Sequence, residues 1–277
     1  MTAPLVLPFD DPRCRDTALA GGKGASLAGM TAEGLPVPPG FVITSAAFAQ
    51  AVDGAALTRH LRARDLERAR DVVRAARPPR DLIERSYRGL GARCSVAVRS
   101  SACAEDGADA SYAGQQETYL FVETPEEVLT KVVACWLSFF SERAVFYREH
   151  KGDLDDIAMA VVVQRMVDAK KAGVMFTVDP VNRRRDRVVV EAARGIGERV
   201  VSGEVTPDYY MLDRKGAVKR SRIVGERVLS ESELADLVEM GLRLAGINGC
   251  PQDIEWAYDD TGPFMLQSRP VTTIWRS

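Results

Sequence analysis

The chain has 277 residues, 46% hydrophobic and 27% charged, which indicates a folded protein with one large domain or two smaller lobes. Its net charge of −2 gives no electrostatic sign of nucleic-acid binding, and no apolar run of about 18 residues predicts a membrane span. Five scattered cysteines and the lack of a signal-peptide pattern predict a cytoplasmic protein with reduced thiols. Two histidines are too few for a histidine-rich metal site.

Three helical patterns are visible in chain order. The arginine-rich stretch 59–93 carries apolar residues at helical spacing and is interpreted as a solvated helix that Pro78-Pro79 ends. A capping box at Thr124 to Glu127 opens a helix expected to run to about His150. A second capping box, at 230–233, opens a helix expected to run through about Ala245.

Short apolar or alternating runs predict nine strands, at 95–99, 118–122, 157–166, 173–178, 187–192, 209–212, 219–224, 253–258 and 264–268. Several neighbouring strands form expected antiparallel hairpins, so the mixture with helices predicts an α+β fold rather than a doubly wound sheet. A hinge expected near 156–167 divides the chain into an N-terminal lobe, 1–158, with a helical insertion, and a C-terminal lobe, 159–277.

The first chemically informative segment, 20–27, surrounds Lys23 with three glycines. Glycines let the backbone approach a ligand closely, and an ammonium is a compact charge suited to phosphate. The order of residues is not that of a P-loop, and a glycine-rich turn before a helix would have the same composition.

Two further segments carry polar residues beside predicted strands. The strand at 95–99 ends in Arg99, which is followed by two serines; this arginine could grip phosphate or pair with an acid between lobes. The small and polar residues 111–118 suit a loop that covers phosphates, and equally an ordinary hairpin turn. Glu191 precedes a glycine-containing segment that could be a phosphate-proximal loop or only a turn.

The predicted hairpin at 253–269 gives the sharpest geometric expectation. A turn centred near Thr261 places Glu255 directly across from Gln267, with Arg269 two residues on and on the same face. Carboxylate and amide oxygens suit Mg²⁺, and a guanidinium can neutralise a transferring phosphoryl group. The alternative is a surface ion pair between Arg269 and either Glu255 or Asp253.

These segments together resemble the ATP-binding domain shared by phosphoenolpyruvate synthase, pyruvate phosphate dikinase and rifampin phosphotransferase. The matching pieces occur in the family's order and cover residues 18 to 273: GGKGASLAGM with GLPVPPGFVIT, VAVRSSA, SYAGQQETYLFV, VVVQRMV, AGVMFTVDP, EAARGIGERVVSGEVTPDYY, QDIEWAY and FMLQSRPVT. The resemblance implies an ATP-grasp fold with the nucleotide between two lobes.

The resemblance also implies roles for individual residues, with ATP and Mg²⁺ as cofactors. Lys23 and Arg99 match phosphate contacts, and Arg269 matches a nearby phosphate-binding arginine; these three are the expected catalytic residues. Glu255 and Gln267 match the Mg²⁺ ligands. The remaining expected nucleotide contacts are Gly114 and Thr118 in the loop over the phosphates and Gln164, Met166 and Val167 on the adenine side.

One family feature is missing from the sequence. Relatives carry a swivelling domain whose histidine, in a T-G-G-x-x-S-H-type loop, accepts the phosphoryl group, and neither His60 nor His150 has that context. We therefore expect a split, AMP-forming phosphotransferase with a separate phosphohistidine carrier and a separate acceptor-binding protein. The alternatives are an excised domain of a larger enzyme, a self-contained small-molecule kinase that forms ADP, and a non-catalytic ATP-binding subunit.

Overall fold

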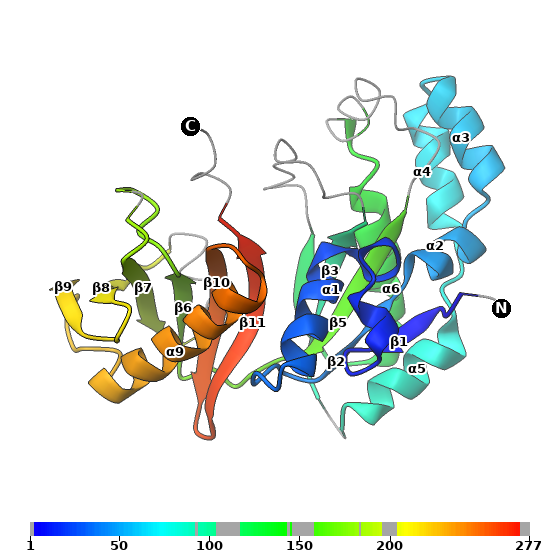
Figure 1. Ribbon diagram of the computed structural model, residues 1–277. Helices are drawn as coiled ribbons and strands as arrows, with labels where there is room; N and C mark the ends of the chain where they lie inside the picture. The colour runs from blue at the N-terminus through cyan, green and yellow to red at the C-terminus, as the bar shows by residue number, and fades with distance from the viewer. Residues whose placement is uncertain are drawn as a thin grey trace. The chain divides into compact units, whose positions relative to one another are not determined.

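The computed structural model describes residues 3–91, 94–103, 117–142, 145, 158–182, 184–195 and 204–271. It contains helices and antiparallel sheets, which confirms the α+β class (Figure 1). The chain forms two compact units: one combines Met1–Gly29 with Pro39–Met166, and the other combines Met30–Pro38 with Val167–Ser277. Within these residues, each unit contains one sheet.

The first unit contains a five-stranded sheet in the order β1-β2-β5-β3-β4, and neighbouring strands are antiparallel. Its strands are β1 (Val6–Pro8), β2 (Gly40–Ile43), β3 (Val96–Ala102), β4 (Thr118–Val122) and β5 (Met159–Arg165). Its helices are η1 (Pro12–Arg15), α1 (Thr17–Ala32), α2 (Ser45–Ala51), α3 (Gly54–Arg62), α4 (Leu66–Arg74), α5 (Arg80–Gly89) and α6 (Pro125–Ser138). The end of α1, from Met30 on, belongs to the second unit.

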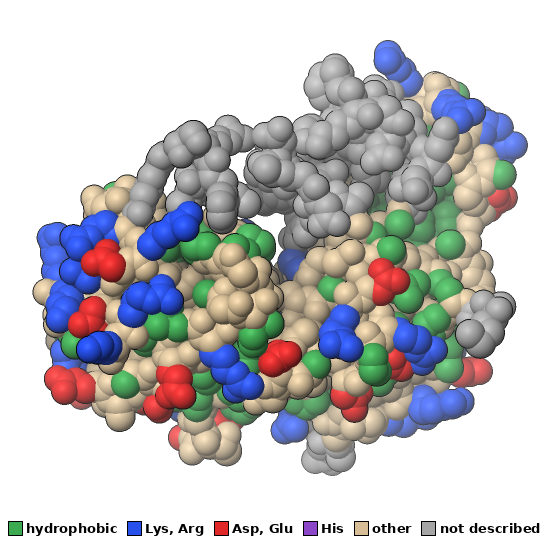
Figure 2. Space-filling view, in the orientation of Figure 1, with side chains coloured by type: hydrophobic (Ala, Val, Ile, Leu, Met, Phe, Trp, Pro, Cys, Tyr) green, Lys and Arg blue, Asp and Glu red, His purple; other side chains and the backbone are tan. Residues whose placement is uncertain are grey.

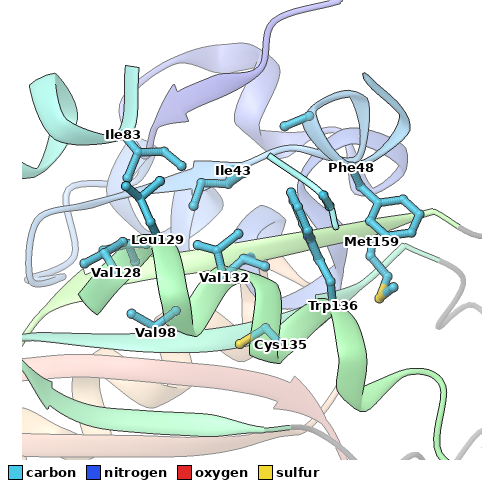
Figure 3. Packing of buried hydrophobic residues seen from close by; sticks show 14 of the residues in the cluster. Ile43, Phe48, Ile83, Val98, Val128, Leu129, Val132, Cys135, Trp136 and Met159 are labelled. Carbon is cyan, nitrogen blue, oxygen red and sulfur yellow. The ribbon is translucent and has the colours of Figure 1, made fainter. Parts of the chain in front are cut away.

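The main core of this unit lies between one sheet face and helices α2 to α6 (Figure 3). Alternate residues of β5, Met159, Val161 and Val163, point into it because successive strand side chains face opposite ways. Trp136 of α6 is fully buried and meets Phe48 edge to face, with ring centroids 5.4 Å apart. Trp136 is therefore a core residue of this unit.

The helices differ from the sequence expectation in two places. The stretch interpreted as one helix up to Pro78-Pro79 contains the end of α3 and all of α4, because Arg64 adopts a φ of 56° and Asp65 caps a new helix by accepting from the Arg68 N–H. Helix α5 begins after the two prolines. The predicted capping box forms at Thr124, but α6 ends at Ser138 rather than near His150. Residues 146–157 lie outside the described part.

The second unit contains a six-stranded antiparallel sheet in the order β11-β10-β6-β7-β8-β9. Its strands are β6 (Lys171–Phe176), β7 (Arg187–Arg194), β8 (Asp208–Asp213), β9 (Val218–Arg222), β10 (Gln252–Asp259) and β11 (Gly262–Pro270). One face packs on helix α9 (Glu231–Ile247), which starts at the second predicted capping box. The opposite face is called the distal face below.

Contacts with α9 identify which side chains belong to each face. Gly241 of α9 lies so close to Met175 that an added Cβ would meet the Met175 Cε at 2.4 Å. The Lys171 Nζ donates to the Glu233 carboxylate of α9 at 2.6 Å. Lys171 and Met175 therefore face α9, and Ala172, Val174 and Phe176 point to the distal face.

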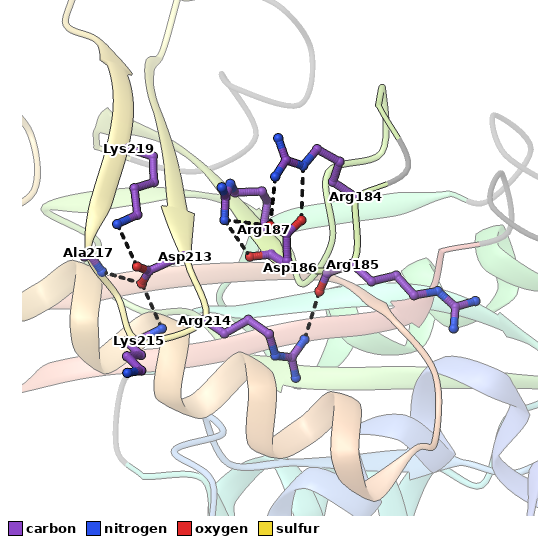
Figure 4. Close-up of polar contacts among 9 residues, drawn as sticks. All are labelled: Arg184, Arg185, Asp186, Arg187, Asp213, Arg214, Lys215, Ala217 and Lys219. Atoms are coloured by element: carbon purple, nitrogen blue, oxygen red, sulfur yellow. Dashed lines mark hydrogen bonds and ion pairs between the residues drawn. The ribbon is translucent and has the colours of Figure 1, made fainter.

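Basic side chains gather around β8 and β9 at the edge of this sheet (Figure 2). Exposed Lys219, Arg220 and Arg222 occupy β9, where charged residues discourage pairing with another chain. In the turn before β9, Asp213 accepts hydrogen bonds from the backbone N–H groups of Lys215 and Ala217 and pairs with Lys219 at 2.9 Å (Figure 4). The turn is thus fixed by one carboxylate.

The compact units divide the chain after Met166, which lies within the hinge range expected at 156–167, and the lobe boundary at 158 stays a prediction. The physical reason is β5, which pairs with both β2 and β3 of the first sheet. Strands β1 and β2 had no sequence prediction, and both are short.

Candidate functional site

The glycine-rich segment spans a break between the two helical segments that make up α1. The helix is broken at Gly21, whose φ is 67° and ψ is 171°. A Cβ at this position would lie 2.6 Å from the Ser101 carbonyl oxygen, so the close approach of α1 to β3 requires glycine. The helix therefore changes direction at Gly21, two residues before Lys23.

Ser101 of β3 joins the two sides of this break. Its hydroxyl, which is fully buried, donates to the Ala20 carbonyl at 2.9 Å and lies 3.3 Å from the donating Gly24 N–H. Beside it, the Lys23 Nζ donates to the Ser100 carbonyl at 3.0 Å. The sequence analysis did not assign Ser101 a role; the only signal was the serine pair after Arg99.

Strand pairing places three predicted site residues on one face of the first sheet. Arg99 lies directly across from Thr118 of β4, and Ala97, two residues before Arg99, lies across from Gln164 of β5. This face also carries Ser101, which contacts α1, and it is opposite to the face that packs on α2 to α6. Arg99, Thr118 and Gln164 therefore share a face with the α1 break.

Gln164 is an unusual residue for a strand interior. Its side chain is 3% exposed, and the Gln164 Nε2 has no hydrogen-bond partner within the described residues. Burial of an unsatisfied amide donor costs about 1–3 kcal/mol. Such a group is stabilised when a ligand supplies an acceptor.

The other expected contacts of this region are placed differently. Met166 follows β5, and its N–H donates to the Ser95 carbonyl at 2.9 Å. Val167 is the first residue of the second unit's long segment, and its carbonyl accepts from the Ala169 N–H at 2.8 Å. Gly114 lies outside the described residues, together with the rest of 104–116.

The β10–β11 hairpin has the predicted register. Glu255 lies directly across from Gln267, and Asp253 lies across from Arg269. The register shifts by one residue between Glu255 and Trp256, because Leu266 is an extra residue in β11. Glu255, Gln267, Asp253 and Arg269 therefore share the distal face, while Trp256 is fully buried on the other.

Arg269 forms the ion pair that the sequence analysis kept as an alternative. Its Nε and Nη2 both lie 2.8 Å from the Asp253 Oδ2. The Asp253 side chain is 12% exposed, whereas that of Arg269 is 61% exposed. Burial raises the pKa of Asp253, the positive charge of Arg269 lowers it in part, and the nearby Glu255 raises it further. A further positive charge would therefore be stabilised here.

The residues of this hairpin fit a magnesium ion. At directly paired positions the Cβ atoms lie about 4.5–5.5 Å apart, so oxygens of Glu255 and Gln267 can converge on one ion. No group of three His, Cys, Asp or Glu side chains in the described ranges could hold a metal. Magnesium commonly takes one or two carboxylates together with water and substrate phosphates, and this donor set suits that arrangement.

A second carboxylate of the distal face lies in the same cross-strand row. Val174 of β6 pairs with Glu255 on one side and with Glu191 of β7 on the other. Glu191 in turn pairs with Tyr209 of β8. The structure therefore places Glu191 within β7, and the glycine-containing segment considered as a loop or turn lies outside the described residues from 196 on.

No helix in the described part of the chain is long and apolar enough to cross a membrane.

Comparison with known proteins gives a family match over nearly the whole chain. The sequence matches the family described as pyruvate phosphate dikinase, AMP/ATP-binding domain, over residues 17–228 and 217–277. A probable phosphoenolpyruvate synthase of Methanothermobacter thermautotrophicus is 42% identical, and the match covers 96% of this chain and 46% of that protein. A rifampicin phosphotransferase of Streptomyces sp. is 38% identical, over 99% of this chain and 37% of that protein.

A third relative, a prodigiosin synthesizing transferase of Serratia marcescens, is 36% identical over 99% of this chain and 34% of its own length. The chain thus spans less than half the length of these three relatives. Among solved structures, a D-alanine–D-alanine ligase from Bacillus anthracis aligns with a TM-score of 0.40 and 10% identity, covering 94% of this chain and 57% of that one. A TM-score this low assigns no fold.

Proposed function

We propose, from the premise that this chain belongs to the pyruvate phosphate dikinase AMP/ATP-binding domain family, that it binds Mg-ATP and transfers a phosphoryl or pyrophosphoryl group to a histidine of a carrier protein. The reaction leaves AMP in the full cycle, and a third protein binds the final acceptor. The two compact units serve as the lobes of an ATP-grasp fold. The observation that carries the proposal is the Glu255–Gln267 pair beside Asp253 and Arg269.

The second sheet supplies the metal and the charge around the transferring group. Glu255 and Gln267 would hold Mg²⁺, which would supply positive charge to the phosphates, and the exposed guanidinium of Arg269 would contact the phosphates while Asp253 orients it. Phosphoryl transfer offers little covalent chemistry to the protein, so positioning and charge neutralisation provide most of the catalysis. The four side chains of this hairpin suit either positioning or charge neutralisation.

The first unit supplies further phosphate contacts and the adenine side. Lys23 and Arg99 bind phosphate oxygens, and the hydrogen bond of Lys23 to the Ser100 carbonyl of β3 holds its side chain in place. Gly114 and Thr118 belong to the loop that covers the phosphates. Gln164 and Met166 of this unit line the base, together with Val167, which belongs to the second unit. The buried Gln164 Nε2 supports this assignment, because an acceptor atom on the adenine ring would satisfy it.

The phosphoacceptor histidine is proposed to lie on a carrier outside these 277 residues. His60 lies in the last turn of α3, without a glycine-rich loop around it, and His150 lies outside the described residues. A carrier attached to the same polypeptide would use the same chemistry.

The experiment incubates the protein with Mg-ATP, alone and with a carrier that bears a T-G-G-x-x-S-H loop, and measures nucleotides and phosphohistidine. AMP and a phosphorylated carrier histidine should form only when both proteins are present. His60→Ala and His150→Ala variants serve as controls and should retain this activity. Formation of ADP by the protein alone with a small-molecule acceptor would contradict the carrier mechanism.

A further inference from the structure

Glu191 and Glu255 flank the same residue on the distal face. Both pair directly with Val174, Glu191 from β7 and Glu255 from β10. Glu191 is half-buried, and its carboxylate has no hydrogen bond or ion pair within the described ranges. An ionised carboxylate only accepts hydrogen bonds, so Glu191 offers acceptor capacity that the described protein groups leave unused.

The direction of β6 determines the order in which the cross-strand rows of the distal face follow Val167. The chain enters β6 directly from 167–170, where the Lys170 N–H donates to the Tyr258 carbonyl at 2.8 Å and its carbonyl accepts from Gly195 at 2.9 Å. The first distal-face residue of β6 is Ala172, which pairs with Ala257 and Ala193. A row of three alanines therefore precedes the row of Val174, Glu191 and Glu255.

This order matches the order of the parts of a nucleotide. Under the proposed function, on which this inference rests, the base lies at the Val167 end and the phosphates lie at Glu255 and Gln267. The sugar, which connects base and phosphates, then lies between these two ends, toward Val174. Two strand spacings, or about 10 Å, separate the backbone of Glu191 from that of Glu255, so Glu191 lies on the flank away from the metal pair.

We infer that Glu191 accepts hydrogen bonds from the ribose hydroxyls and makes the site selective for ribonucleoside triphosphates. A vicinal diol has two donors that one carboxylate can accept together, and a carboxylate has this task in many dinucleotide sites. Glu191 is thus a specificity-determining residue, distinct from the ligands of the metal.

The test measures equilibrium binding of ATP, 2′-deoxy-ATP and 3′-deoxy-ATP in the presence of Mg²⁺. The wild-type protein should bind ATP about 10- to 100-fold more tightly than either deoxy analogue, because a hydrogen bond to a charged group is lost in each. Glu191→Gln should weaken ATP binding and leave deoxy-ATP binding nearly unchanged, so that the ratio of the two affinities falls toward one. Glu191→Asp should retain part of the preference for ATP over the deoxy analogues.

The matched control is Glu226→Gln, which removes a carboxylate of the same unit whose side chain is 85% exposed. It should keep the full preference, and thermal unfolding of each variant reports whether the fold is intact. If wild-type ATP binding is tight but Glu191→Gln keeps the preference, the inference is wrong and the proposed function stands. Equal loss of ATP and deoxy-ATP binding in Glu191→Gln would also overturn it, because Glu191 would then act on the phosphates, the metal or the fold. No Mg-ATP binding by the wild-type protein would instead contradict the proposed function.

Discussion

Glu255 and Gln267 face each other across β10 and β11 because Leu266 is an extra residue without a partner in β10. The hairpin turn itself is short, since Asp259 already pairs with Gly262. Without the bulge, this turn would place Leu266 opposite Glu255 and send Gln267 toward the buried side. The bulge therefore brings the two proposed metal ligands together.

Deletion of Leu266 should preserve this relationship, because a regular hairpin then pairs Glu255 with Gln267 directly. Deletion of Ser268 should instead move Arg269 opposite Ile254, on the buried side, and destabilise the unit. Mg-dependent ATP binding and thermal unfolding of the two deletion variants check this prediction. If the Leu266 deletion abolishes metal-dependent binding in a folded protein, the bulge has a different role from the one assigned.

Local sequence signals predicted much of the fold. Both capping boxes form, and Thr118–Val122 is a strand with the predicted bounds. The Glu255–Gln267 register was also predicted, although for a reason that the structure corrects. The expected turn was centred on Thr261, whereas the structure combines a tighter turn with a bulge, and the two arrangements give the same pairing.

Features that depend on residues far apart in sequence could not be predicted. The break of α1 at Gly21 is one such feature, because the Ser101 hydroxyl of β3 contacts both sides of it. The shared face of Arg99, Thr118 and Gln164 follows from the strand order β5-β3-β4, which no local pattern encodes. The roles of these residues in ATP binding stay predictions.

Ser101→Ala should lower the free energy of unfolding by about 1–3 kcal/mol, because the buried Gly24 N–H and Ala20 carbonyl lose a partner. It should also weaken ATP binding by about tenfold, since Lys23 follows the same break and loses its fixed position. Denaturant unfolding and ATP titration measure the two effects.

Ser45→Ala is the matched control for Ser101→Ala. It removes a serine hydrogen bond to the Ala18 carbonyl of α1, which lies before the break and is exposed. ATP affinity should be unchanged in this variant. Equal ATP affinities of Ser101→Ala and the wild-type protein would show that the break does not position Lys23.

Asp213 should make stability depend on pH in acid. The Lys219 ammonium and the backbone N–H groups of Ala217 and Lys215 lower the pKa of Asp213 from 3.8 to about 2. A carboxyl group with a lowered folded-state pKa stabilises the protein fully above its unfolded value, and this contribution is lost as pH falls toward 2.

The measurement for Asp213 is denaturant unfolding of the wild-type protein and Asp213→Asn at pH 5 and pH 3. The difference in free energy of unfolding between them should be clearly smaller at the lower pH. A difference that is equal at both pH values would contradict the assigned pKa and the role of this carboxylate in the β8–β9 turn.

The most direct test of a magnesium–nucleotide site on the second sheet is calorimetric titration of ATP into the wild-type protein and Glu255→Gln, each with and without Mg²⁺. The wild-type protein should bind ATP more tightly with Mg²⁺, and Glu255→Gln should lose at least about tenfold of that gain while unfolding at a similar temperature. The same gain from Mg²⁺ in both proteins would contradict the assignment of Glu255 as a metal ligand, and with it the central claim about this site.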